Sequence, residues 1–128
     1  MVTDYYASVL NTQNNLYSVN TNKAIRYILS NITQDISLMS IAETLELSQS
    51  YISRLFAKET GISITKFVNK NRIQYSIKLL LKNELSLHEI AEKSGFNSYN
   101  YFLKVFKEET SYTPSQFFEN HFSKESLI

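Results

Sequence analysis

The stretch Ser63–Lys82 reads SITKFVNKNRIQYSIKLLLK and predicts one long helix, because it holds no glycine or proline that would break one. Ser63 suits the position before the first turn, where its hydroxyl can accept a hydrogen bond from an unpaired backbone N–H. Basic side chains lie between two apolar clusters, which are Ile64, Phe67, Val68 and Ile73, Ile77, Leu80, Leu81. The spacing predicts that separate segments cover the two ends of this helix, which is about 30 Å long.

The composition favours an all-α chain and excludes several chemistries. The 128 residues include two glycines, one proline and no cysteine. Without cysteine there are no disulfides or thiolate metal sites, and we expect a cytoplasmic protein. No apolar run approaches the ~18 residues of a membrane span. His88 and His121 lie far apart, and the sequence has no Gly-rich phosphate loop, so we expect no enzyme, metal or cofactor.

Charge is unevenly distributed along the chain. Residues 1–20 carry a net charge of −1, residues 21–82 carry +5 and residues 83–128 carry −3, which together give the overall +1. A basic segment is the electrostatic pattern of nucleic-acid binding, so residues 21–82 predict such a partner. The acidic remainder predicts that the first half of the chain supplies most of the affinity.

Apolar residues spaced by three and four predict six further helices, three on each side of the long one. We expect the first three at Thr21–Ile32, Leu38–Leu45 and Gln49–Thr60, with Gly61 ending the third. After the long helix, Ser86 and Glu89 match a capping box, and Gly95 ends that helix. Asn97 or Ser98 caps Tyr99–Thr110, and Pro114 begins the last helix, which is followed by a frayed tail. Tyr5, Tyr6, Val9 and Leu10 could form a short amphipathic turn before an Asn-rich linker.

The two halves of the chain repeat one pattern. Ser37 and Ile41-Ala42-Glu43 match Ser86 and Ile90-Ala91-Glu92, forty-nine residues on. The following helices, with their serine caps, inner apolar residues and Glu-Thr ends, match at fifty residues. The extra residue falls in the intervening turn. A capped short helix, a tight turn and a second capped helix form the helix-turn-helix plan, so the chain contains it twice.

The run Ile90–Phe118, IAEKSGFNSYNYFLKVFKEETSYTPSQFF, resembles the signature of the AraC/XylS family of bacterial transcription regulators. The matching positions are Ile90-Ala91, Gly95-Phe96, Tyr101-Phe102, Phe106-Lys107 and Pro114, and the first half is similar. The resemblance implies a DNA-binding domain with two helix-turn-helix subdomains, at 21–62 and 83–122, joined by a long helix at 63–82. Residues 1–20 are then an arm or linker, and residues 123–128 a tail. Ser111 stands where the family usually has glycine.

The resemblance also implies how the domain binds. The second helix of each subdomain would enter a major groove, with the two helices about one DNA turn, ~34 Å, apart. Their outward faces provide the predicted base contacts, which are Gln49, Ser50, Ser53 and Arg54 in the first and Tyr99, Asn100, Leu103 and Lys104 in the second. Predicted phosphate contacts are Ser48, Lys58, Lys70, Arg72, Ser98 and Lys107.

Two functions remain open from the sequence. The first is sequence-specific binding of double-stranded DNA at the bacterial nucleoid, with activation of transcription through RNA polymerase. Family members often carry an upstream regulatory domain, which would make this chain part of a longer regulator. The alternative is a protein-interaction module of the same fold, which binds another regulator or RNA polymerase and has little DNA affinity. The weak charge of the second half supports this alternative.

Overall fold

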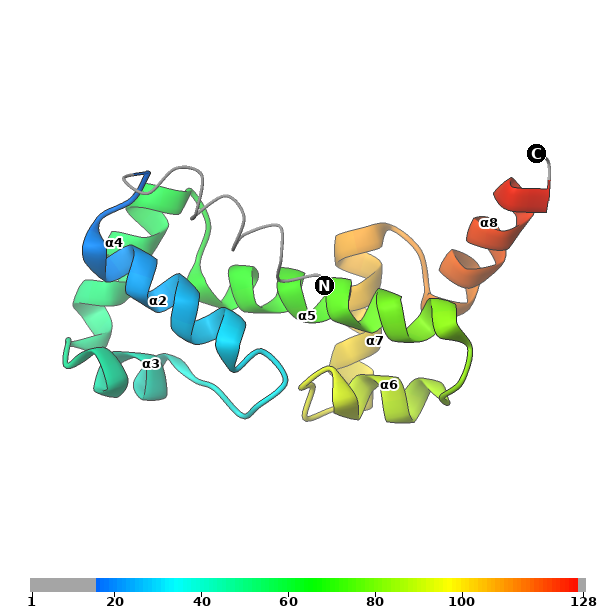
Figure 1. Cartoon of the computed structure of the whole chain (residues 1–128), viewed down its shortest axis with the longest axis horizontal. Helices are drawn as coiled ribbons and strands as arrows, with labels where there is room; N and C mark the ends of the chain where they lie inside the picture. Colours follow the sequence, from blue (N-terminus) through cyan, green and yellow to red (C-terminus); the bar gives the residue numbers. More distant parts are fainter. Residues whose placement is uncertain (1–15, 127–128) are drawn as a thin grey trace. The chain divides into compact units, whose positions relative to one another are not determined.

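The computed structural model describes residues 16–126, with side chains through residue 122. This part of the chain is all-α, as predicted (Figure 1). Its helices are α2 (Val19–Ser30), α3 (Leu38–Leu45), α4 (Gln49–Thr60), α5 (Ile64–Lys82), α6 (Leu87–Lys93), α7 (Tyr99–Thr110) and α8 (Pro114–Ser126). The predicted bounds of α3, α4 and α7 are confirmed. The backbone divides into two compact units, with the boundary between Asn71 and Arg72, inside α5.

In the first unit, α2, α3 and α4 pack against one another in all three pairings (Figure 1). Their shared core, called the first core here, is built from the inner faces that the spacing predicted. Ile28, Ile41, Ile52 and Phe56 are all fully buried in it. α5 contributes its first apolar cluster, and the ring of Phe67 meets that of Phe56 edge-on with centroids 5.4 Å apart. Residues distant in sequence therefore form one core.

The first unit begins earlier than the apolar spacing indicates. α2 starts at Val19 and ends at Ser30, two residues before the predicted bounds at each end. Polar contacts set this start: Nδ2 of Asn22 donates to the Tyr17 carbonyl at 3.1 Å, and the Ser18 N–H donates to the Glu59 carboxylate at 2.9 Å. Apolar periodicity carries no signal for such bonds. The predicted amphipathic turn at residues 5–10 lies outside the described residues.

α5 is a single helix of 19 residues that contributes to both cores. Its first apolar cluster lies in the first core. Ile73 and Leu80 lie in the core of the second unit, called the second core here, with Ile77 packed against it. The sequence pattern named Leu81 for this cluster, whereas Leu79 packs against the second core and Leu81 is half-buried. The prediction of two apolar clusters on one helix is therefore confirmed, with one member corrected.

In the second unit, α7 packs against both α6 and α8. Phe102, Val105 and Phe106 of α7 are buried in the second core, and Phe106 meets Phe117 of α8 at right angles with centroids 5.7 Å apart. α8 extends to Ser126, so the tail predicted to fray from residue 123 is helical up to that point. No glycine or proline between Phe122 and Ser126 interrupts it.

The two units repeat their hydrogen bonds as well as their apolar positions. The Thr60 hydroxyl bridges the Phe56 and Ile62 carbonyls at 2.7 and 3.0 Å. Thr110 bridges the matching carbonyls of its own unit at 2.8 and 3.0 Å. The residue after each threonine is left-handed, with φ of 84° at Gly61 and 71° at Ser111. This left-handed backbone is the condition under which Ser111 costs roughly 1 kcal/mol relative to glycine.

Candidate nucleic-acid interface

The N-terminal turn of α4 is a solvent-facing polar surface on a buried support. The Ser48 hydroxyl accepts a hydrogen bond from the Tyr51 N–H at 3.1 Å, which fixes where the helix begins. Gln49 and Ser50 are exposed beyond this cap, and Ser53 is half-buried. Ile52, on the opposite face, is fully buried. The predicted base contacts of the first unit therefore share one helix end, held by the core beneath it.

Arg54 is exposed, and its side chain runs back toward the start of α4. Its Nε donates to the Ser50 carbonyl at 3.3 Å, one turn earlier in the helix. This bond uses one donor, and the two terminal guanidinium nitrogens carry four more. The guanidinium therefore lies near the helix end where base-contacting residues of a recognition helix are found, with the fork geometry that matches guanine O6 and N7.

The start of α7 has the same cap but a different surface. The Ser98 hydroxyl accepts from the Tyr101 N–H at 3.2 Å, so Ser98 rather than Asn97 is the cap. Asn100 and Lys104, two of the predicted base contacts, are exposed. Tyr99 and Leu103 are also predicted base contacts, but both are half-buried and pack against the second core. Only part of each of these two side chains is therefore accessible to a ligand.

The Tyr99 ring is also covered from α6. His88 stacks on it with ring centroids 3.7 Å apart and planes inclined by 14°. The His88 side chain is itself exposed. Its contact with Tyr99 was missed because nothing in a single sequence marks two rings on successive helices as neighbours.

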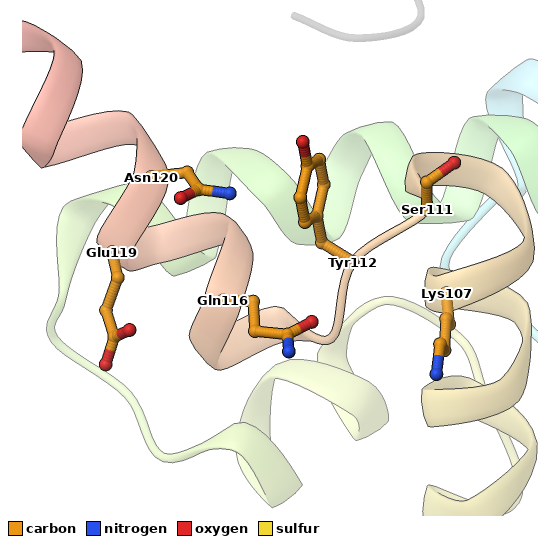
Figure 2. Close-up of a pocket in the computed structure, with 6 residues that line it drawn as sticks. All are labelled: Lys107, Ser111, Tyr112, Gln116, Glu119 and Asn120. Carbon is orange, nitrogen blue, oxygen red and sulfur yellow. The ribbon is translucent and has the colours of Figure 1, made fainter.

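The predicted phosphate contacts differ in exposure. Lys58 and Lys107 are exposed, whereas Lys70 and Arg72 are half-buried on α5, and both of these have interactions within the protein. Lys107 lines a polar pocket of about 470 Å³ together with residues that follow α7. Figure 2 shows two of the residues that line this pocket, Lys107 on α7 and Gln116 near the start of α8. Glu119 also lines the pocket, and its negative charge opposes the binding of an anion there.

The helix bounds locate the positive charge more narrowly than the sequence segments did. α5 holds five basic residues and no acidic one, and these are Lys66, Lys70, Arg72, Lys78 and Lys82. The +5 of residues 21–82 therefore belongs to α5, and the remaining residues of that segment balance. The net charges of α4 and α7 differ by one. α4 has Arg54 and Lys58 against Glu59, whereas α7 has two lysines against two glutamates.

Two glutamates are held in the ionised form by backbone donors. The Ser18 N–H lowers the pKa of Glu59, and the Thr21 and Ser18 hydroxyls add to this effect. The Ser86 N–H lowers the pKa of Glu89, which completes the predicted capping box of α6. Glu59 connects the end of α4 to the residue preceding α2. It therefore helps to hold α4 in place rather than offering a ligand site.

Among the residues described, no group of three or more histidine, cysteine, aspartate or glutamate side chains could hold a metal ion. Within that same part of the chain, no helix is both long and apolar enough to cross a bilayer.

Residues 41–120 match a family model described as a helix-turn-helix domain, which is more than half of the chain. This chain belongs to the AraC-type helix-turn-helix family. The resemblance found in the sequence is therefore confirmed. Members of the AraC-type family are transcription regulators, so the chain is a DNA-binding regulator domain and not an enzyme.

Similar proteins agree with this assignment. PocR, a regulatory protein of Salmonella typhimurium (strain LT2), is 36% identical over 95 residues, which are 74% of this chain and 31% of PocR. The C-terminal domain of AraT, a response regulator from Geobacillus stearothermophilus, has a TM-score of 0.77 at 36% identity, covering 80% of this chain and 86% of that chain. The DNA-binding domain of AdpA, solved with a target DNA, has a TM-score of 0.77 over 87% of this chain and all of its own. At 17% identity, AdpA shows a likeness of fold alone.

The chain spans 31%, 55% and 29% of the length of three relatives that it matches. The effector, the oligomeric state and the sign of regulation are properties of whole regulators. The family match therefore supports only a DNA-binding domain of a transcription regulator.

Proposed function

We propose that the protein binds a specific double-stranded DNA site by inserting α4 and α7 into successive major grooves, and that it activates transcription. The proposal rests chiefly on one observation: two helices with identical serine caps each present exposed polar side chains at the start and a buried apolar face behind. Gln49 and Arg54 on α4, with Asn100 and Lys104 on α7, suit adenine and guanine edges. Ser50 and Ser53 add weaker hydrogen bonds.

Phosphate contacts supply the affinity that does not depend on sequence. We assign these contacts to Lys58, Lys70, Arg72 and Lys107, together with the backbone N–H groups at the caps of Ser48 and Ser98. Four neutralised phosphates predict a slope of about −4 in a plot of log affinity against log salt concentration. The alternative function, an interaction module with little DNA affinity, is not favoured by membership of the family.

Activation requires a contact with RNA polymerase in addition to DNA. Base contacts occupy the first turns of α4 and α7 only, and exposed apolar side chains elsewhere, such as Met39 and Tyr112, are available to a protein partner. An upstream regulatory domain and a place of action at the nucleoid in the cytoplasm complete the proposal.

Selection of binding sites from randomised duplex DNA tests the first claim. We expect a preferred sequence with two half-sites, bound with the salt dependence given above. Binding that shows no preference at low salt, or none at all, would contradict the proposal. In vitro transcription from a promoter placed beside the selected site then tests activation, for which we expect more transcript with the protein than without it.

A further inference from the structure

A ring stack joins the two helices of the second helix-turn-helix. His88 is the second residue of α6, Tyr99 is the first residue of α7, and their rings lie face to face at 3.7 Å and 14°. The Tyr99 ring continues inward to Phe102, which is fully buried, with centroids 6.3 Å apart. Tyr99 is thus fixed between an exposed imidazole and the second core.

The first unit has no equivalent of this stack. α3 matches α6 at an offset of forty-nine residues, so Met39 corresponds to His88. α4 matches α7 at an offset of fifty, so Gln49 corresponds to Tyr99. Neither has an aromatic ring, and Met39 is 55% exposed. The stack is therefore not part of the scaffold that both units share, because the first unit folds without it. The stack is thus specific to the second unit, and it lies at the start of α7, where the predicted base contacts of that unit are found.

The surface beside the stack is apolar at helical spacing. Leu103 lies one turn after Tyr99, so the two side chains share a face of α7. Asn100 and Lys104, the polar candidates, lie one position further along. In the major groove, apolar side chains distinguish thymine by its C5 methyl group, whereas a hydrogen bond is needed for the other bases. The Tyr99–Leu103 face has the chemistry for a thymine methyl.

We propose that His88 is a positioning residue that holds the Tyr99 ring against a thymine methyl, and so sets a base preference in the half-site of the second unit. His88 itself makes no base contact in this arrangement. A half-buried tyrosine could adopt other side-chain conformations when DNA approaches, and the imidazole on its outer face removes that freedom before binding. The inference rests on the proposed DNA binding by α7 and adds to it the residue that determines one base.

The test compares thymine with deoxyuridine, which lacks only the C5 methyl group. Fluorescence anisotropy measures affinity for the selected duplex and for duplexes with each thymine replaced in turn. We expect one replacement in the half-site of the second unit to weaken wild-type binding by about three- to tenfold. The same replacement should have no effect on Tyr99→Ala or His88→Ala. His88→Phe keeps a flat ring for stacking and should restore the wild-type response.

Met39→Ala is the matched control, because it truncates the corresponding side chain of the first unit and should leave the response unchanged. Circular dichroism melting shows whether each variant is folded. Because the His88 side chain is exposed, we expect His88→Ala to remain folded. If His88→Ala retains the wild-type response, or if His88→Phe fails to restore it, the positioning role is wrong. If the proposed DNA binding itself is wrong, the result is different, because the wild-type protein then selects no sequence from randomised DNA. That result would also overturn the positioning role of His88.

Discussion

The two helix-turn-helix units have nearly the same scaffold but different surfaces. Their serine caps, threonine bridges and left-handed residues after α4 and α7 correspond position by position. At the start of the second helix, however, the first unit presents Gln49 and an exposed arginine, whereas the second presents a stacked His88–Tyr99 pair. The repeated positions are those where backbone geometry or burial leaves little choice. The positions that differ are exposed, where the fold accepts many side chains and a ligand can select among them.

This comparison assigns charge-based recognition to the first unit and contact with apolar base groups to the second. The difference in charge between α4 and α7 is one unit, so it cannot by itself produce a large difference in affinity. The kind of contact matters more. A guanidinium makes two directed hydrogen bonds to guanine, whereas a lysine makes a less directed contact.

The largest effect should come from Arg54. We expect Arg54→Ala to weaken binding to the selected site by about 1–3 kcal/mol, because it removes a two-pronged base contact. Lys104→Ala in the second unit should cost less, about 0.5–1 kcal/mol. Anisotropy titrations measure both, with Arg26→Ala on the exposed surface of α2 as the control. A greater loss for Lys104→Ala would reverse the assignment of the two units.

Exchanging the residues that end α4 and α7 tests whether the scaffolds are equivalent. A Cβ on Gly61 would meet nothing within 4 Å, so only the left-handed backbone penalises a side chain there. We expect Gly61→Ser to lower the free energy of unfolding by about 1 kcal/mol and Ser111→Gly to raise it by up to about 1 kcal/mol. Denaturant unfolding measures both variants. Changes of the same sign would show that the two ends are not equivalent.

Ser94 is fully buried at the end of α6, and its hydroxyl has no hydrogen-bond partner. The corresponding residue of the first unit is Leu45, which has no polar group to satisfy. We expect Ser94→Ala to raise the free energy of unfolding by about 0.5–1 kcal/mol, because it removes an unpaired buried group. Ser76→Ala is the control, since that buried hydroxyl donates to the Ile73 carbonyl at 2.6 Å. Equal effects at both serines would contradict this account.

Glu59 should give a small stability effect that depends on pH. Because the Ser18 N–H lowers the folded-state pKa, the carboxylate stabilises the fold above its unfolded-state pKa, near 4.5, and loses this effect as pH falls through the folded-state value. Wild type should therefore be more stable than Glu59→Gln at neutral pH, by less than about 1 kcal/mol, and this difference in the free energy of unfolding should shrink as the pH falls below 4.5. Glu43→Gln, exposed on α3, controls for the change in net charge. A gap that widens in acid would rule out this role.

The sequence predicted most of the fold because its signals are local. Serine caps, the single proline and apolar spacing predicted the helix bounds, and the structure differs from them at both ends of α2 and at the end of α8. α2 begins early because Asn22 and Glu59 bond the backbone before it, and Leu79 rather than Leu81 packs against the second core. The bond to Glu59 and the packing of Leu79 depend on neighbours that are distant in the chain, whereas the bond of Asn22 to Tyr17 is local but polar, so apolar spacing carries no signal for it.

The candidate site was predicted less completely than the fold. Exposure on a helix face can be inferred from spacing, so Gln49, Arg54, Asn100 and Lys104 were identified as accessible side chains. The partial burial of Tyr99 and Leu103 and the stack on His88 depend on packing between helices, which spacing within one helix does not reveal. DNA contact by any of these residues stays a prediction.

The central claim is that α4 and α7 bind successive major grooves of one DNA site. Hydroxyl-radical and methylation footprints on the selected duplex test it directly, with Arg54→Ala and Asn100→Ala as variants that each remove one contact. The account predicts two protected regions on one face, centred about 10 base pairs apart, with each variant weakening a different region. A single protected region, or the same region weakened by both variants, would contradict it.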